Sequence, residues 1–383
     1  MISEEKKKTI LDKRIMAARE AAGFSITQAA QKLGFNNYQT LSAIEKGTRK
    51  INAHELVMMA RLYGRSLDYF LETDVSSDPV PLWRRKTETD IKQVQRQFLC
   101  FLKNYSRMER LLDLKRRWKD IQKNYDRDDF AENGFERADR LGTEIHHFLD
   151  LGSRPSSNLL NVLENKLRFK ILHMPLDDGV SGASTVDNTL GVGILINAND
   201  APWRRNFDLA HELFHVITWN VFSAEEIGTG TKKTRPEKYA DIFASNLLLP
   251  EVHLRDLLNE TITNNNVKSI DIIELAKEFG VSTSAILWRL VNLETIKKSR
   301  AQKVLDNQKF RNLDRTRRRG LYVSDKPSKF PSRFISIACR CLMEGKITRG
   351  TFSEYLEIDR ADIDSYLEDF GFIEANYAKI AAA

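Results

Sequence analysis

Two histidines and a glutamate carry the clearest chemistry in this sequence. His211, Glu212 and His215 form the pattern His-Glu-x-x-His in a segment with helical periodicity. Residues four apart on an α-helix lie one above the other, so both imidazoles face one point and can coordinate one Zn²⁺. Glu212 stands beside them and can take a proton from an attacking water as general base. The spacing predicts a zinc-dependent hydrolytic site; the alternative is two histidines that are simply packed or hydrogen-bonded on a helix face.

A catalytic zinc needs a third protein ligand, and the best candidate is Glu237. The extended pattern with a later Gly and His is excluded because Thr218 and Val221 occupy those positions. Glu237 heads the run EKYADIFASNLL on its apolar stripe, where a carboxylate is costly unless it is paired. Asp241, one turn further on, is placed to accept the free N–H of a ligating histidine. The alternative for Glu237 is an N-terminal acid that stabilises the helix dipole.

A domain of mixed helices and strands, which we place at residues 131–296, must position these side chains. Apolar runs at 167–173 and 190–196 predict strands, separated by turn residues at 177–182. Helices are expected at 207–219 and 237–249. No residue identifies itself as an oxyanion stabiliser; Tyr239 and His253 are candidates by proximity in sequence alone.

Residues 1–75 predict a separate domain of short helices. The helices are expected at 12–22, 26–33, 39–46 and 53–63, after which Leu67, Phe70 and Leu71 are expected to close the core. This order predicts a helix-turn-helix that reads double-stranded DNA, although helix triplets also occur without DNA. The side chains expected at base edges or phosphates are Gln28, Asn37, Gln39, Thr40, Ser42 and Lys46.

The composition indicates a soluble chain of two or three folding units. The chain has 383 residues, 42% of them hydrophobic, and no apolar run approaches the ~18 residues of a membrane helix. The charged N-terminus lacks the features of a signal peptide, so we expect a cytoplasmic protein without a membrane partner. The three cysteines form no C-x-x-C pair and are expected to be reduced, packed thiols.

Positive charge is concentrated in two stretches. The net charge is +7, but residues 84–125 hold 13 Lys or Arg against 5 acids, and residues 297–333 hold 13 against 3. Binding to phosphates favours such stretches because it releases counterions, and solvated linkers also contain them. We expect residues 297–333 to be a basic linker that either stays solvated or binds single-stranded nucleic acid, with Phe310 and Tyr322 available to stack on bases.

Residues 76–130 combine a Pro- and Ser-containing linker with a long amphipathic helix. Apolar residues recur at spacings of three and four from Ile91 to Tyr125, with a phase slip near 108–111. A helix of this length requires a partner along its stripe, which is either a second copy of the chain, giving a homodimer, or the neighbouring domain. Residues 334–383 indicate a small C-terminal helical unit.

The string WRRNFDLAHELFHVITW, followed by PEKYADIFASNLLLPE, closely resembles the ImmA/IrrE metallopeptidases. That family has an arginine-rich lead into an AHELGH-like helix and then ExxANxFAxxLLxP. The chain departs from it at Asp208 and Phe214, neither of which is a ligand position. The resemblance covers about residues 132–293 and implies a zincin-like (gluzincin) domain in which the two histidines and Glu237 bind zinc and Glu212 is the general base.

The N-terminal string LGFNNYQTLSAIEKGTRKI resembles the Cro and repressor (XRE) family, which is commonly fused to or encoded with ImmA/IrrE domains. The two resemblances imply a mainly α chain with a five-helix XRE domain, a small α+β zincin-like catalytic domain and a C-terminal helical unit. They imply a zinc endopeptidase that regulates transcription by cleaving a repressor protein in a stress, mobile-element or defence response. The rival hypothesis is a DNA-binding repressor or antitoxin-like regulator whose zincin domain senses a ligand or binds a partner.

Overall fold

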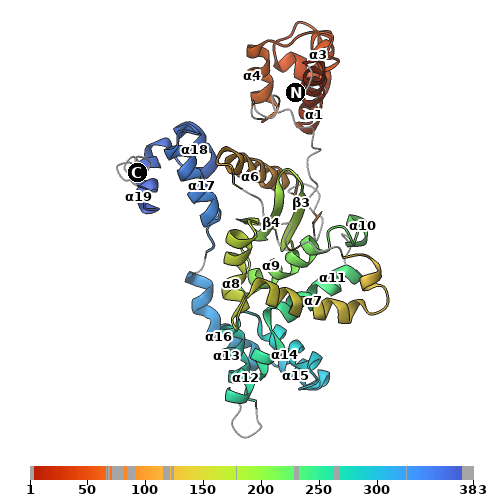
Figure 1. Cartoon of the computed structure of the whole chain (residues 1–383), viewed down its shortest axis with the longest axis vertical. Helices are drawn as coiled ribbons and strands as arrows, with labels where there is room; N and C mark the ends of the chain where they lie inside the picture. The colour runs from red at the N-terminus through yellow and green to blue at the C-terminus, as the bar shows by residue number, and fades with distance from the viewer. Residues whose placement is uncertain are drawn as a thin grey trace. The chain divides into compact units, whose positions relative to one another are not determined.

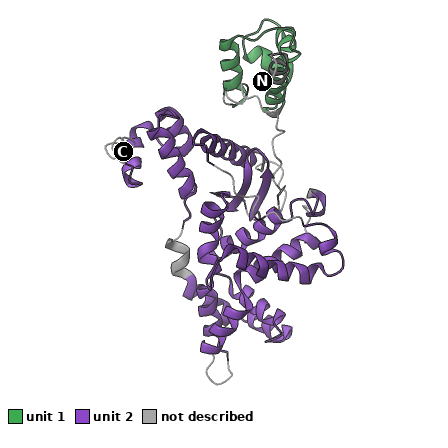
Figure 2. Cartoon of the chain, in the orientation of Figure 1, with its two compact units in different colours: residues 1–77 green, residues 78–383 purple. Residues whose placement is uncertain are grey.

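The computed structural model describes residues 4–65, 67, 70, 82–83, 91–114, 121, 125–177, 179–227, 233–261, 267–324 and 326–372. The chain divides into two compact units, residues 1–77 and 78–383 (Figure 2). Helices dominate both units, and the second also contains one small sheet (Figure 1). The predicted fold class, mainly α with a small α+β part, is therefore confirmed. No helix in the described ranges is long and apolar enough to cross a membrane.

The first unit is a bundle of short helices: α1 (Glu4–Ala21), α2 (Ile26–Lys32), α3 (Tyr38–Glu45) and α4 (Ala53–Leu62). A side-chain cap begins each of the last three, because Ser25, Asn37 and Asn52 each accept the backbone N–H three residues further on. Phe70, one of the three residues expected to close the core, is buried, whereas Leu71 and the fifth helix that the resemblance implies after α4 fall largely outside the described residues.

A shared core and one buried ion pair fix the orientation of α3. Leu41 and Ile44 of α3 are fully buried in the same apolar cluster as Ile15 of α1. Arg19 donates from Nε to one carboxylate oxygen of Glu45 at 2.7 Å and from Nη2 to the other at 3.1 Å. A two-point Arg–carboxylate contact has a defined geometry, so it holds the C-terminal end of α3 against α1.

The sheet of the second unit has the order β1-β3-β4-β2. Its strands are β1 (Leu82–Trp83), β2 (Lys170–Met174), β3 (Gly182–Asp187) and β4 (Gly191–Asn197). β4 is parallel to β2 and antiparallel to β3, and β1 pairs antiparallel with β3 at two residues. β2 and β4 overlap the two predicted runs and each ends one residue later, whereas β3 was not expected. The turn between β3 and β4 is closed by Asp187, which accepts the backbone N–H groups of Thr189 and Leu190.

Helices cover both faces of the sheet. Figure 1 shows β3 and β4 between α6 (Ile91–Leu111) and α9 (Pro202–Ile217). Alternate residues of a strand point to opposite faces, and Ile194 and Ile196 belong to the core that contains α9. Leu195 belongs to the other core, with Phe98 and Leu102 of α6. This two-sided burial explains why β4 is apolar along nearly its whole length.

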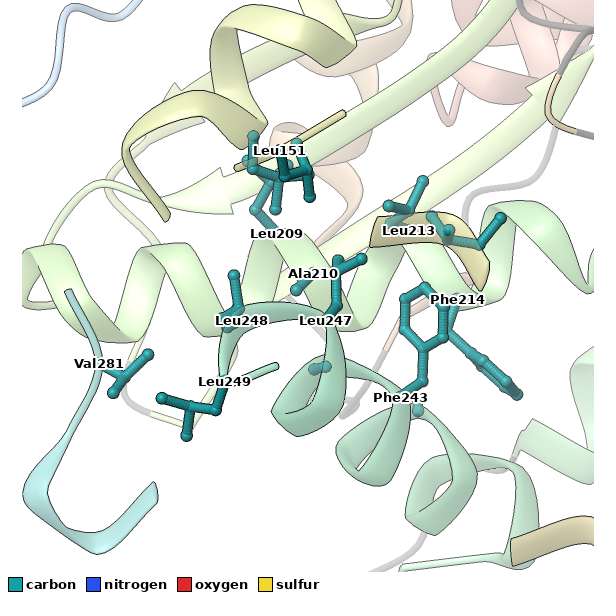
Figure 3. Close-up of a cluster of buried hydrophobic side chains, with 14 of the residues drawn as sticks. Leu151, Leu209, Ala210, Leu213, Phe214, Phe243, Leu247, Leu248, Leu249 and Val281 are labelled. Atoms are coloured by element: carbon teal, nitrogen blue, oxygen red, sulfur yellow. The ribbon is translucent and has the colours of Figure 1, made fainter. Parts of the chain in front are cut away.

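The α9 layer continues into α11 (Arg235–Leu248) and α7 (Gly134–Leu149). Figure 3 shows Phe214 of α9 beside Phe243 of α11, and their ring centroids are 5.6 Å apart. α7 and α11 approach closely at Gly142, where an added Cβ would lie 2.9 Å from the carbonyl oxygen of Phe243. Only glycine permits this helix spacing, which holds α11 against α9.

The other helical elements complete the second unit around these layers. They are η2 (Asp128–Phe130), α8 (Pro155–Asn161), η3 (Val162–Lys166), α10 (Ala224–Ile227), α12 (Glu251–Thr261), α13 (Ser269–Glu278), α14 (Thr283–Asn292), α15 (Lys298–Asp306), α16 (Gln308–Ser324), α17 (Ser332–Met343), α18 (Arg349–Leu356), η4 (Arg360–Asp362) and α19 (Ile363–Asp369).

The long helix α6 packs against its own chain. Phe101 and Tyr105 each place their rings 5.0 Å from the ring of Phe334 in α17. The apolar stripe of residues 91–111 is therefore covered by other parts of the same chain. Of the two expected arrangements, a second copy or the neighbouring domain, the structure shows the intramolecular one. The helix ends at Leu111, and Asp113 has a φ of 50°. The phase slip in the sequence coincides with this end rather than with a continuing helix.

A buried ionic cluster joins α6, β2 and α17. Glu109 lies 2.9 Å from Lys170 Nζ and 2.7 Å from Arg333 Nη1. Arg333 also donates to the hydroxyl of Tyr105 at 2.9 Å, and Lys170 donates to the carbonyl of Leu190 at 2.7 Å. Burial alone would raise the pKa of Glu109, but the two cations outweigh it and hold that pKa below its ordinary value. The C-terminal helices are thus tied to the sheet by charge as well as by apolar packing.

Glu164 in η3 lies near this cluster and makes folding depend on pH. Burial raises its pKa from 4.5 to about 7 although Arg333 acts in the opposite direction. The folded chain then keeps a proton that the unfolded chain loses, so the free energy of unfolding falls as pH rises from about 4.5 to about 7. Between pH 5 and pH 8, the free energy of unfolding should fall by on the order of 3 kcal/mol less in Glu164→Gln than in the parent protein. Urea unfolding at the two pH values measures this difference. Equal pH dependence in both proteins would contradict this assignment.

The basic segment 297–333 is mostly helical and packs through a few buried side chains while most of its basic side chains stay exposed, which corrects the expectation of a basic linker. α15 and α16 occupy most of it. Phe310 is only 5% exposed, so the prediction that it stacks on unpaired bases is wrong. Arg318 is 2% exposed and lies 4.6 Å from the ring of Trp203, while it donates to the carbonyl of Val281 and to Asp314. The side chain of Tyr322 lies outside the described residues.

Candidate metal centre and nucleic-acid interface

Two helices bring the predicted metal ligands together. α9 begins with Pro202 in its first turn, and its apolar residues bury it between the sheet and α11. His211 and His215 lie on one face, and α11 places Glu237 opposite them. The Nε2 atom of His211 is 3.4 Å from one Glu237 oxygen, and that of His215 is 3.0 Å from the other. The exposed fractions are 0% for His211, 2% for His215 and 8% for Glu237, so the cluster is buried.

The donor set fits a metal ion. The three ligand atoms lie within 4.8 Å of one another, and no other such group of three or more occurs among the described residues. Three polar atoms of this cluster are buried and make no hydrogen bond within the described part of the chain, although they lie close to one another. They are Nε2 of His211, Nε2 of His215 and Oε1 of Glu237. Buried polar atoms that converge without hydrogen bonds are costly, and a shared cation satisfies all three.

Electrostatics keep Glu237 ionised. Burial by itself would raise its pKa, but the polar contacts with His211 and His215 outweigh burial and hold the pKa far below the ordinary value. Asp241 behaves in the same way, since contacts with His211 and Lys233 outweigh its burial and lower its pKa. Two carboxylates that stay charged inside the fold match the charge requirement of a divalent cation.

Asp241 orients the first histidine. Its Oδ1 lies 3.0 Å from Nδ1 of His211, and its other oxygen accepts from Lys233. A hydrogen on Nδ1 leaves the lone pair of Nε2 free to face Glu237. Asp241 thus lies within hydrogen-bonding distance of His211, and Lys233 is a further contact that sequence reasoning missed.

Glu212 lies next to the sheet rather than in open solvent. It is 1% exposed, and a Cβ added to Gly182 of β3 would be 3.4 Å from its Oε1. The backbone of β3 therefore approaches this carboxylate closely. Gly182 was expected only as the end of a turn, and the small and β-branched residues that follow it, Ser184, Thr185 and Val186, are the signal that could have revealed the strand.

Two expected oxyanion candidates lie elsewhere. Tyr239 is two residues after Glu237, so it points to a different side of α11, and its ring packs against Phe130 and Phe135. His253 lies beside His146, with ring centroids 6.2 Å apart. Both proximity-based suggestions were therefore wrong, because residues near in sequence on a helix need not share a face.

The residues expected at DNA do not all present free side chains. Asn37 accepts from the backbone N–H and the hydroxyl of Thr40, and Gln28 accepts from the backbone N–H of Ser25. Gln39 and Lys46 are exposed, whereas Ser42 and Thr40 are half-buried. Tyr38, which is 51% exposed at the start of α3, is a surface aromatic that sequence reasoning missed.

The fold and the site together define a protein with a helix-turn-helix unit and a peptidase-like unit that carries a candidate metal centre. Residues 15–70 match the helix-turn-helix family model, and residues 164–291 match the IrrE N-terminal-like domain of peptidase family M78. The two matches identify a helix-turn-helix domain near the N-terminus and an IrrE-like domain in the middle of the chain. Helix-turn-helix domains imply DNA binding, and this peptidase family is typically metal-dependent.

One curated relative is similar to part of the chain. The chain is 36% identical over 81 residues to the HTH-type transcriptional regulator ImmR of Bacillus subtilis (strain 168). The match covers 21% of this chain and 58% of ImmR, so the chain spans somewhat more than half the length of this relative.

Proposed function

We propose that this chain is a DNA-binding regulator whose second unit is a zinc-dependent endopeptidase. The observation that carries the proposal is the convergence of two imidazole nitrogens and a Glu237 oxygen, with Glu212 buried beside them. His211, His215 and Glu237 are the ligands, Asp241 positions His211, and Glu212 is the general base. Two nitrogen donors and one carboxylate are a ligand set typical of catalytic zinc sites.

The residues divide the work of hydrolysis between them. His211, His215 and Glu237 would hold Zn²⁺, which when bound would supply Lewis acidity toward a peptide carbonyl and toward water. Glu212 accepts the proton from the attacking water and passes it to the leaving nitrogen. Its burial excludes bulk solvent, which strengthens its interactions with the charges that develop during the reaction.

A repressor protein is the substrate that best links a peptidase to a DNA-binding unit. Cleavage of a repressor would convert the peptidase reaction into a change of transcription in a stress, mobile-element or defence response. The rival function, a regulator with a sensing or partner-binding zincin unit, is supported by the relative whose name records regulation alone. The burial of Glu212 against β3 favours the enzyme, since a binding module has no need of a general base there.

Incubation of the purified chain with repressors encoded beside its gene tests the proposal. We expect a defined cleavage product by intact mass spectrometry, its loss with a chelator, and its recovery on addition of Zn²⁺. If every tested repressor stays intact with the zinc-loaded chain, the endopeptidase function is contradicted and the regulatory alternative gains.

Exposed positions on α3 and directly after it predict how the first unit binds duplex DNA. Gln39 is placed to reach a base edge and Lys46 a phosphate. We expect Gln39→Ala to weaken binding to the specific operator by about 1–3 kcal/mol, and Lys46→Ala to weaken all sequences alike with a shallower salt dependence. Fluorescence anisotropy with operator and random duplexes over a salt series measures both effects. Equal losses on both duplexes for Gln39→Ala would place Gln39 outside the base-reading set.

A further inference from the structure

The two edges of β3 are paired very differently. β4 pairs with β3 from Gly182 to Asp187. Among the described residues, the other edge pairs with β1 alone, where Leu82 lies opposite Ser184 and Trp83 opposite Ala183, in antiparallel orientation. Without β1, β3 would be the edge strand of the sheet, and edge strands offer a row of backbone donors and acceptors to any extended peptide.

This edge lies beside the candidate general base. Gly182 directly precedes the two β3 residues that pair with β1, and its Cα faces the Glu212 carboxylate. Ser184 is two residues further along and shares the face of Gly182. A peptide added to β3 in the register of β1 therefore places its residue opposite Gly182 next to Glu212.

We propose that Leu82–Trp83 is an internal competitor, which occupies the outer edge of β3 where an extended polypeptide substrate would add as a strand. The inference deepens the proposed endopeptidase function and rests on it. The substrate class is an unfolded or loop segment of a protein, because a helical segment has no free backbone groups to add to the strand. In the sequence, Leu82–Trp83 lies between the first unit, residues 1–77, and α6.

The size of β1 makes it exchangeable. A strand of two residues forms a short ladder, and such pairings are marginal on their own. A substrate that pairs along more of β3 has more backbone groups to engage and can displace it. The internal strand is nevertheless present at high effective concentration because it is part of the same chain, so it lowers the affinity of short peptides.

A disulfide lock in the full chain tests the proposal. Leu82→Cys with Ser184→Cys joins two directly opposed residues, whose Cα separation of about 4.5–5.5 Å in antiparallel pairs suits a disulfide. Cys100, the exposed native cysteine, is changed to Ser, while Cys339 and Cys341 are buried. The background carries Glu212→Gln so that binding is measured without hydrolysis. The probe is a fluorescein-labelled peptide with the sequence of residues 78–90, DPVPLWRRKTETD.

We expect the oxidised protein to bind the probe at least about tenfold more weakly than the same sample after reduction, equal to about 1.4 kcal/mol. Leu82→Pro with Trp83→Pro, which releases the edge, should bind it about tenfold more tightly than the parent protein. Ser76→Pro with Ser77→Pro, the matched change earlier in the same connection, should leave the affinity unchanged.

Three results would overturn the inference: failure of the disulfide to form by thiol titration, equal binding in the oxidised and reduced states, or no probe binding by the released variant. Failure of the proposed endopeptidase function can be distinguished from failure of this inference. If no repressor is cleaved but the lock weakens binding, the β3 edge is a peptide site without peptidase activity. If repressors are cleaved while the lock changes nothing, the enzyme stands and the internal competitor does not.

Discussion

Glu212→Gln should lower the rate of peptide hydrolysis by about 10²–10⁴-fold and leave the metal content unchanged. The amide has nearly the shape of the carboxylate but cannot accept a proton, so water loses its base and the leaving nitrogen loses its proton donor. Glu212 is not among the three converging ligand atoms, which is why the metal should stay. Initial rates of cleavage, normalised to metal measured by inductively coupled plasma mass spectrometry, provide the comparison.

Glu225→Gln is the matched control for this variant. Glu225 is an exposed glutamate of α10 and should show the parent rate. A Glu212→Gln protein that retains more than about a tenth of the parent rate would remove Glu212 from the role of base. A protein that loses metal together with activity would show that Glu212 supports the metal site instead.

Glu237→Gln should reduce the bound metal from one ion per chain to near zero, and hydrolysis should disappear with it. A neutral amide is a poor ligand for Zn²⁺, and the two histidines alone leave the site one protein donor short. In the parent protein, His211 and His215 already hold the pKa of Glu237 well below its usual range once burial has been overcome, so the carboxylate is ready to bind a cation at neutral pH. Metal content after dialysis against a weak chelator measures the effect.

The same variant has a stability readout that does not depend on a substrate. A ligand that binds only the folded state stabilises it by an amount that grows with its concentration. Added Zn²⁺ should therefore raise the melting temperature of the parent and of the exposed-site control Glu260→Gln, but not that of Glu237→Gln. Full metal loading of Glu237→Gln, or of the variant with both histidines changed to Ala, would rule out this centre.

Local periodicity was sufficient to predict the helices that carry the site. His211 and His215 share a helix face because of their spacing, and α9 and α11 lie where the apolar stripes place them. The inward position of Glu237 also followed from its stripe, since a helix orients every residue on it once one face is buried. The helix-turn-helix unit was predictable for the same reason, with glycines and capping residues marking each helix end.

The strand β3 could not be predicted from local periodicity. Its residues, GASTVD, are small or polar and lack the apolar run that identified β2 and β4. They form a strand because β4 and α9 bury them, so the structure-forming interaction is long-range and has no local period. The closeness of Gly182 to Glu212, and the pairing of Leu82–Trp83 beside it, depend on that strand.

The charged residues also separate what the sequence determined from what the tertiary structure decided. By itself, the sequence determined which residues are apolar, charged or able to bind metal, and the helical spacing that places His211 and His215 together. Only the tertiary structure decided that Arg318 packs on Trp203, that Glu109 lies between Lys170 and Arg333, and which partner covers α6. The physical reason is that helical periodicity acts over three or four residues, whereas these contacts join positions far apart in the chain, where many partners are chemically equivalent until the fold selects one.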